Sequence, residues 1–199
     1  MRVAILVHGL YTGFSDKSSL SMLSTGLVEQ GFKLLPFNYG KLTLFSANKN
    51  KVVASWLIDV VKKLKREKGL DITLIGFSNG CAIIDLALRE LPGDYNLDVV
   101  YISPLLSSRP ILPPCVNKML VVSNPKDHIV RLLQPLSFLK KFLKSRNWGL
   151  AAITGYLGSD PRVTNLIIRS QNATPFAQHL ATLHHPTHRT LLLHYIRTF

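Results

Sequence analysis

The pentapeptide Gly-Phe-Ser-Asn-Gly at residues 76–80 constrains the fold of this chain more than any other feature. It follows a short apolar run at residues 71–75 and precedes a run of helix-forming residues at 81–88. This order predicts a strand, a sharp turn and a helix, with Ser78 at the apex of the turn. In such a turn the serine backbone is strained and its hydroxyl stands clear of the sheet. The pattern therefore predicts a nucleophilic serine rather than an ordinary turn.

Apolar runs alternate with helix-like segments along the rest of the chain. Strands are predicted at residues 2–8, 32–38, 71–76, 97–103, 117–123 and 163–169. Most of them are nearly continuous apolar runs, which is typical of strands buried on both faces. Helices are predicted at residues 16–30, 49–68, 79–91 and from 186 to the end of the chain. The alternation favours βαβ units and hence an α/β fold with a parallel sheet.

The length and composition favour one domain over residues 1–199. Hydrophobic residues make up 47 % of the 199 residues, which is enough for a sizeable core. No apolar run is long enough to cross a membrane, and the run at residues 3–7 is too short for the core of a signal peptide. We therefore expect a cytoplasmic protein. Cys81 and Cys115 are not spaced as in a metal site or a redox motif, and we expect no disulfide.

The charge of the chain is unusually positive. The formal net charge is +13, which favours an anionic partner such as an anionic membrane surface. A solvated basic surface with no dedicated partner is the alternative interpretation. No nucleic-acid-binding motif is present, so we expect no specific nucleic-acid partner.

Residues 135–148 form a basic amphipathic pattern. Leucines and a phenylalanine share one predicted helix face, and lysines and arginine occupy much of the rest. This segment lies within residues 131–160, which we interpret as a candidate lid or insertion over the active site. It would allow peripheral association with a membrane. The alternative is an ordinary surface helix packed on the sheet.

A serine hydroxyl needs a general base, and the base needs a carboxylate to orient it. Asp127 follows the predicted strand at 117–123 after a short loop. This position is at the carboxyl edge of the sheet, where open α/β sheets bind their ligands. We predict that Asp127 is the acid, with Asp160 before the last strand as the alternative.

The base is expected after the last strand, where the chain is rich in histidine. Five histidines lie in this tail: His179, His184, His185, His188 and His194. His179 follows a polar segment at 170–174 that can lead from the strand end to a site above the sheet. We predict that His179 is the base, with His185 as the alternative. The tail has no HExxH pattern and no aspartate or glutamate, so we expect no metal and no cofactor.

The negative charge that develops on the acyl oxygen needs hydrogen-bond donors, which are usually backbone amides. One is predicted at Asn79, the residue after the nucleophile. The second is expected from the glycine-punctuated segment at residues 8–13, after the first strand, and we assign it to Leu10. His8 is interpreted as a structural residue that holds this segment.

Four segments resemble the small lipase- and esterase-like members of the α/β-hydrolase superfamily. They are Val-His-Gly-Leu at 7–10, the pentapeptide at 76–80, Asp-His-Ile-Val at 127–130 and the tail at 179–186. The tail is similar to the terminal pattern of that superfamily, in which the catalytic histidine is followed by leucine and proline. This similarity favours His179 over the later histidines.

The resemblance spans nearly the whole chain and implies a minimal α/β-hydrolase fold. Such a fold has a mostly parallel sheet of about six strands with helices on both faces, and here it lacks the first two strands of the superfamily. It also implies a Ser78–His179–Asp127 triad that works through an acyl-enzyme. The chain departs from the pattern at Cys81, where many members have a glycine. The interval between Asp127 and His179 is also longer than usual.

The sequence thus predicts a serine hydrolase that acts on carboxylic esters, of the esterase or lipase kind. The substrate is expected to be a small-molecule or lipid-like ester, since the apolar face at 135–148 suits lipid-like acyl chains. Thioesters and amides stay open, as do the acyl group and the oligomeric state. The alternative is a non-catalytic binding module on the same scaffold, which would use its basic surface for an anionic partner.

Overall fold

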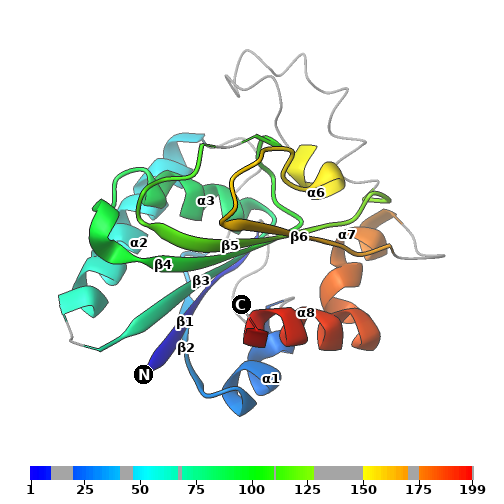
Figure 1. Ribbon diagram of the computed structural model, residues 1–199, viewed down its shortest axis with the longest axis horizontal. Coiled ribbons are helices and arrows are strands. Elements are labelled where there is room, and N and C mark those ends of the chain that lie inside the picture. Colours follow the sequence, from blue (N-terminus) through cyan, green and yellow to red (C-terminus); the bar gives the residue numbers. More distant parts are fainter. Residues whose placement is uncertain are drawn as a thin grey trace.

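Six parallel strands form the centre of the molecule, with helices on both sides of the sheet (Figure 1). The computed structural model describes residues 1–9, 20–40, 47–66, 69–109, 111–127, 150–169 and 175–198. Its strands are β1 (Arg2–Val7), β2 (Phe32–Phe37), β3 (Asp71–Phe77), β4 (Leu97–Ile102), β5 (Val116–Ser123) and β6 (Val163–Ile167). Every neighbouring pair is parallel. The predicted α/β fold with about six mostly parallel strands is confirmed.

The order of the strands creates one point where the direction of the chain reverses. Across the sheet the order is β2-β1-β3-β4-β5-β6. The chain therefore runs from β1 outward to β2, returns to the other side of β1 as β3, and then continues toward β6. In open parallel sheets, ligands bind outside the carboxyl ends of the strands at such a reversal. Here that place lies between the ends of β1 and β3, where Val7 pairs with Gly76.

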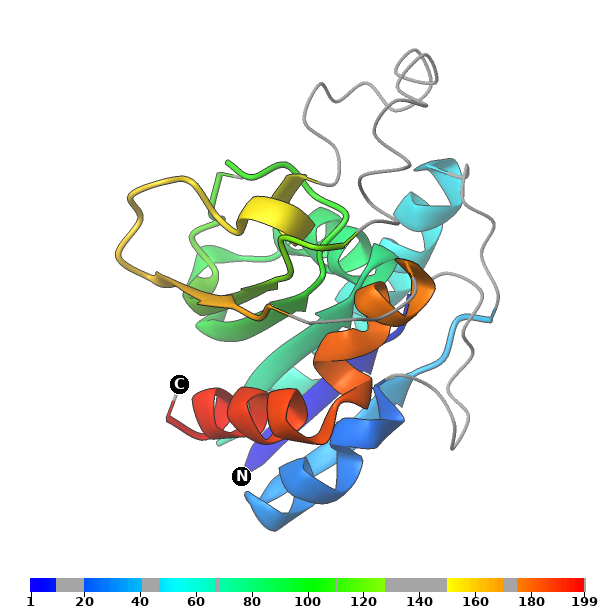
Figure 2. The same ribbon diagram turned by 90° about the vertical axis from the view of Figure 1, so that its right-hand side faces the viewer.

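Helices bury the two faces of this sheet. They are α1 (Ser24–Glu29), α2 (Ala47–Arg66), α3 (Asn79–Leu88), α6 (Leu150–Thr154), α7 (Pro175–His184) and α8 (Pro186–Thr198). The short 3-10 helices are η1 (Ser21–Leu23) and η2 (Gly93–Tyr95). Figure 2 shows α1, α7 and α8 gathered on one side of the sheet.

Strand residues alternate between two apolar cores, because successive side chains of a strand point to opposite faces. On β1, Val3, Ile5 and Val7 belong to the core that includes α2 and α3. Ala4 and Leu6 belong to the core that includes α1, α7 and α8. The predicted arrangement of helices on both faces is therefore present.

The outer strands differ from the prediction of continuously buried runs. That expectation fits β1, β3, β4 and β5, but β2 and β6 each expose several residues. Both are edge strands, with a neighbour on one side only. Lys33 and Pro36 of β2 are exposed, as are Thr164 and Asn165 of β6. A proline is tolerated there because an edge strand does not need every N–H for the sheet.

The helices also differ in detail from the prediction. In the described part of residues 16–30, the chain forms η1 followed by the short α1 rather than one continuous helix. Two helices, α6 and α7, were not predicted. The helix at 135–148 and residues 131–149 of the candidate lid lie outside the described residues. Within 150–160, Ala152 of α6 is buried beside Leu105. Among the helices described, none combines the length and apolar character needed to cross a membrane.

Candidate active site

Ser78 occupies a strained turn between β3 and α3. Its φ of 54° and ψ of −119° lie outside the conformations that residues other than glycine adopt easily. Such backbone strain costs on the order of 1–3 kcal/mol and persists only where the surroundings enforce it. Here the Ser78 N–H donates to the carbonyl of Ile102 at 2.9 Å, and Cys81 N–H donates to the Ser78 carbonyl at 3.1 Å. The turn therefore holds the serine in a fixed position at the end of β3.

Two glycines allow this turn to form. A Cβ on Gly80 would lie 2.1 Å from the carbonyl oxygen of Val7 and 2.6 Å from that of His8. A Cβ on Gly76 would lie 2.9 Å from the backbone nitrogen of Cys81. All three distances are too short for any real side chain. The first turn of α3 can approach the ends of β1 and β3 this closely only because Gly80 and Gly76 lack side chains.

His179 and Asp127 form a buried pair. The Nδ1 atom of His179 lies 2.6 Å from Oδ2 of Asp127. Asp127 is 0 % exposed and His179 is 7 % exposed. Asp127 belongs to the turn that follows β5, where its N–H donates to the carbonyl of Asn124 at 2.9 Å. A carboxylate that accepts from Nδ1–H fixes the imidazole tautomer, so that Nε2 carries the lone pair.

The pair lies beside the end of β3. The ring of His179, on α7, is 5.1 Å from the ring of Phe77, the residue that precedes Ser78. The carboxyl ends of β3 and β5 and the helix α7 thus bring Ser78, His179 and Asp127 to one edge of the sheet. Such an arrangement of hydroxyl, imidazole and carboxylate is suited to acyl transfer.

Asp160, the alternative acid, and His185, the alternative base, form contacts outside the His179–Asp127 pair. Asp160 precedes β6 and forms a two-pronged ion pair with Arg162, with the shortest contact at 2.7 Å. Hydrogen bonds from Arg162 lower the pKa of the Asp160 carboxyl. His185 is exposed before α8, where its ring lies 4.5 Å from that of His188. Leu10, the predicted second oxyanion donor, lies outside the described residues.

Asn79 begins α3 and is 6 % exposed. Its side chain exchanges two hydrogen bonds with the amide of Asn50 on α2, at 3.0 and 3.1 Å. The sequence reasoning missed Asn50, which no motif distinguishes from the other polar residues of that helix.

A second support missed from the sequence lies behind the end of β1. The hydroxyl of Tyr39 donates to the carbonyl of His8, and the two rings stack with centroids 4.0 Å apart. Burial lowers the pKa of His8, although its bond to the carbonyl of Gly9 partly opposes this effect. Burial raises the pKa of Tyr39. These contacts hold His8 in place at the end of β1, and Tyr39 lies two residues after the end of β2.

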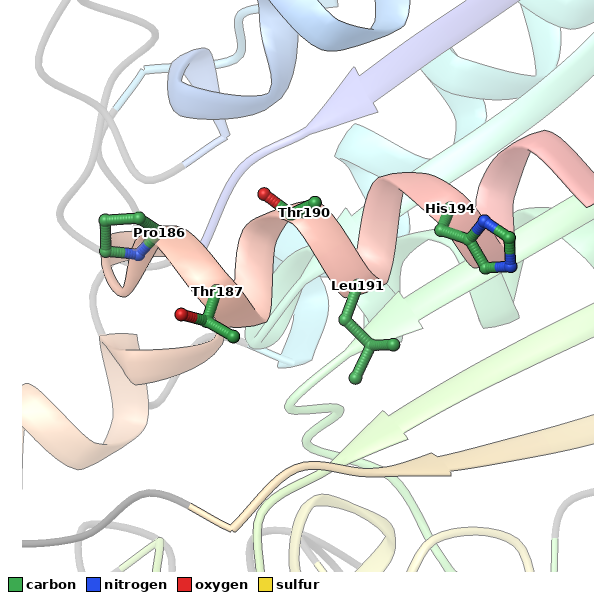
Figure 3. Close-up of a pocket in the computed structure, with 5 residues that line it drawn as sticks. All are labelled: Pro186, Thr187, Thr190, Leu191 and His194. Carbon is green, nitrogen blue, oxygen red and sulfur yellow. The ribbon is translucent and has the colours of Figure 1, made fainter.

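A shallow cleft of about 600 Å³ lies elsewhere, along α8 (Figure 3). Its lining residues are Pro186, Thr187, Thr190, Leu191 and His194. Figure 3 shows Thr187 and Leu191 pointing the same way from the helix. None of the candidate catalytic residues lines this cleft. In the part of the chain that the structure describes, no group of three or more histidine, cysteine and acidic residues could hold a metal ion.

Comparison with known proteins identifies the fold. No protein-family model matches the chain, and no curated protein matches its sequence. Among solved structures, a cutinase-like protein from Cryptococcus sp. aligns over 100 % of this chain and 94 % of its own, with a TM-score of 0.61 and 14 % identity. The dienelactone hydrolase from Anabaena variabilis aligns over 100 % and 84 %, with a TM-score of 0.60 and 14 % identity.

A third similar structure is an alpha-beta serine hydrolase homologue from Coxiella burnetii. It aligns over 98 % of this chain and 85 % of its own, with a TM-score of 0.58 and 18 % identity. At such low identity, these similarities concern the fold. Together with the six-stranded parallel sheet and the strained serine turn, they show that the chain has the α/β-hydrolase fold.

Proposed function

We propose that this protein is a serine hydrolase that cleaves carboxylic esters through an acyl-enzyme. One observation carries the proposal: a buried histidine–carboxylate pair lies beside the strained turn of Ser78. Neither feature is needed to build a parallel sheet, and each costs free energy that function would explain. Proteins of the same fold with hydrolase or carboxylesterase names add support.

In the proposed reaction, the Oγ atom of Ser78 attacks the acyl carbon. Nε2 of His179 takes the serine proton and then delivers it to the leaving oxygen, which departs as an alcohol. Asp127 keeps Nδ1 of His179 protonated and stabilises the imidazolium that forms. Water then attacks the acyl-enzyme by the same route, releasing the acid and restoring Ser78.

The oxyanion would bind to backbone amides at the same edge of the sheet. The N–H of Asn79 lies at the start of α3, where the helix dipole favours negative charge. A second amide is proposed at Leu10, which follows the β1 end. No metal or cofactor takes part in these steps.

Labelling with a fluorophosphonate tests the activated serine. Wild-type protein should be modified on Ser78, as mapped by mass spectrometry, and Ser78→Ala should not react. His179→Ala should slow the labelling by at least about 100-fold because the hydroxyl loses its base. His185→Ala is the matched control, since it removes an exposed histidine from the same tail, and it should label at the wild-type rate.

Absence of label on the wild-type protein, with detergent present and absent, would refute the proposal. Salt-sensitive binding to anionic vesicles by such an unreactive protein would instead favour the non-catalytic binding module. Labelling that persists in His179→Ala but falls in His185→Ala would replace the proposed base with His185.

We further propose that the ester is lipid-like and is met at an anionic membrane surface. On α2, Val52 and Trp56 are 51 % and 52 % exposed and lie one helical turn apart. Lys49 and Lys51 are exposed near them on the same helix. Exposed aromatic and apolar side chains flanked by lysines are typical of helices that contact anionic lipid surfaces. The Asn50–Asn79 contact places this end of α2 next to Ser78.

Vesicle sedimentation tests this surface. Wild-type protein should bind vesicles of phosphatidylglycerol and phosphatidylcholine, and a Val52→Ser, Trp56→Ser double variant should bind at least about fivefold less. Turnover of a soluble short-chain ester should be the same in both proteins, because the double variant leaves the triad intact. Equal vesicle binding by the two proteins, or equal wild-type activity on dispersed and aggregated ester, would refute the lipid proposal.

A further inference from the structure

We propose, on the basis of the serine hydrolase activity proposed above, that Asn50 and Tyr39 are positioning residues for the oxyanion hole. Neither touches the reacting atoms. Together they hold α2, the turn after β3 and the end of β1 through two neighbouring sets of hydrogen bonds, which we term the amide clamp. The amide clamp consists of Asn50, Asn79, Tyr39 and the backbone carbonyls of His8 and Gly9.

The first link of the amide clamp joins α2 to α3. The side-chain amides of Asn50 and Asn79 each donate one hydrogen bond to the other, at 3.0 and 3.1 Å. Two antiparallel bonds between planar groups fix both distance and orientation, whereas a single bond would leave rotation free. The Asn79 side chain and its backbone N–H share one Cα, so holding the side chain also restrains the proposed oxyanion donor.

The second link joins Tyr39, beside the same asparagine, to the end of β1. The hydroxyl of Tyr39 donates to the carbonyl of His8, and the carbonyl of Gly9 lies 3.4 Å from it. The side chain of Asn79 lies close enough to the Tyr39 hydroxyl to lower the tyrosine pKa, although burial has the larger effect and raises it. The net result is a pKa above the ordinary value, so Tyr39 stays protonated and keeps donating.

Close packing on the other side completes the arrangement. A Cβ on Gly9 would lie 3.2 Å from Cβ of Ser78. A Cβ on Gly80 would clash with the carbonyls of Val7 and His8, so the backbone of Gly80 packs directly against them. The end of β1 is thus held between the serine turn and the ring of Tyr39, which stacks on His8 at an interplanar angle of 12°. The end of β1 and the serine turn therefore cannot shift independently while the amide clamp is intact.

The energetic consequence concerns the transition state. Loss of one oxyanion donor typically reduces kcat about 10²- to 10³-fold, and a misplaced donor costs less. We therefore expect Asn50→Ala and Tyr39→Phe each to lower kcat by about 10- to 100-fold, with KM changed by less than about threefold. Tyr39→Phe keeps the ring that stacks on His8, so it removes the hydrogen bonds alone. Asn48→Ala, an exposed asparagine on the same helix, is the matched control and should retain wild-type kcat.

A transition-state analogue separates positioning from general loss of structure. An alkyl boronic acid forms a tetrahedral adduct with Ser78 and uses the oxyanion donors, whereas the carboxylate product does not need them. The inhibition constant of the boronic acid should rise in Asn50→Ala and Tyr39→Phe by the same factor by which kcat/KM falls. The inhibition constant of the product should stay within about threefold of wild type. Equal loss for both ligands, or no loss for either, would overturn the proposal.

A double-mutant cycle tests the link between the two asparagines. Asn50→Ala and Asn79→Ala should each reduce kcat/KM, and the double variant should be no worse than about threefold below the poorer single variant. Multiplicative losses would mean that the two side chains act separately, which would contradict the amide clamp.

Hydrogen exchange gives a readout that does not depend on turnover. Backbone amides of residues 76–82 should exchange at least about tenfold faster in Asn50→Ala than in Asn48→Ala, because the clamp restrains this turn. If wild-type protein lacks esterase activity and this acceleration is still seen, the proposed function fails while the amide clamp stands. If exchange does not change, the amide clamp itself is refuted, whatever the activity.

Discussion

The Nδ1 atom of His179 lies 2.6 Å from Oδ2 of Asp127, although 52 positions separate the two residues in the sequence. Helix α7 carries the histidine, and the turn after β5 carries the carboxylate. Neither element is part of the serine turn, so the pair is assembled by the packing of α7 near the turn after β5. A substitution in this pair should therefore affect the chemistry much more than the local structure around Ser78.

Asp127→Asn should reduce kcat by roughly 10³- to 10⁴-fold with little change in KM. An amide at this position can donate to Nδ1 and so favours the wrong imidazole tautomer, while its shape preserves the packing. The measurement is steady-state turnover of a short-chain ester. Asp160→Asn is the control, because that carboxyl pairs with Arg162 at the other end of β6. Loss of turnover in the control but not in Asp127→Asn would reverse the assignment of the acid.

Gly80→Ala should destabilise the protein by roughly 3 kcal/mol and lower Tm by roughly 6–12 °C. The added methyl would meet two backbone carbonyl oxygens, which cannot move without shifting β1. Gly26→Ala is an instructive comparison, since there the methyl would meet the end of the Leu193 side chain, which can rotate away. Thermal unfolding of both variants decides the point. A smaller decrease in Tm for Gly80→Ala than for Gly26→Ala would contradict this prediction.

The stability of the protein should fall as the pH drops below about 6.5, and His8 should contribute to that fall. The ordinary histidine pKa of 6.5 applies to the unfolded chain, and burial lowers the pKa of His8 in the folded state. Between the two values the unfolded chain binds the proton and the folded protein does not, so acid favours unfolding. Urea unfolding of wild type and His8→Phe at pH 7.5 and 5.0 tests this. An equal pH-dependent loss in the two proteins would exclude a contribution from His8, and His194→Ala controls for removal of an imidazole.

Both cysteines should be inert in the folded protein. Cys81 and Cys115 are free and buried, and burial raises the pKa of each thiol. Thiolates are the reactive form, so a disulfide reagent should titrate less than about 0.1 thiol per chain in native buffer and about two in denaturant. Rapid reaction of either thiol in native buffer would show that its surroundings open readily.

The sequence was sufficient for most of the sheet because buried parallel strands leave a strong local signal. Each of the six strands lies within two residues of its predicted bounds. The serine turn was also predictable, since the two glycines and the strand–helix context lie within a few residues of Ser78. The burial of the edge strands β2 and β6 was predicted less accurately, because their partial exposure depends on their place in the sheet rather than on their composition.

The surroundings of the site were less accessible to prediction. Helix α7 was not recognised because a polar segment precedes it, a proline begins it and its 3.6-residue period spans only a few turns. The contact of Asn50 with Asn79 joins helices whose packing no local pattern encodes. The roles of Ser78, Asp127 and His179 stay predictions until their chemistry is measured.

The division of the apolar cores has a consequence for synthesis on the ribosome. Leu23 and Leu27 share a core with Leu192 and Ile196 of α8, which is synthesised about 170 residues later. In addition, the side chain of Gln30 donates to the carbonyl of Leu193 at 2.9 Å. Until α8 leaves the exit tunnel, part of one apolar face of the sheet stays exposed in the nascent chain. We expect that His179 of α7 is not held in its final position during this time. We expect chaperones that recognise apolar segments to bind this chain until α8 docks.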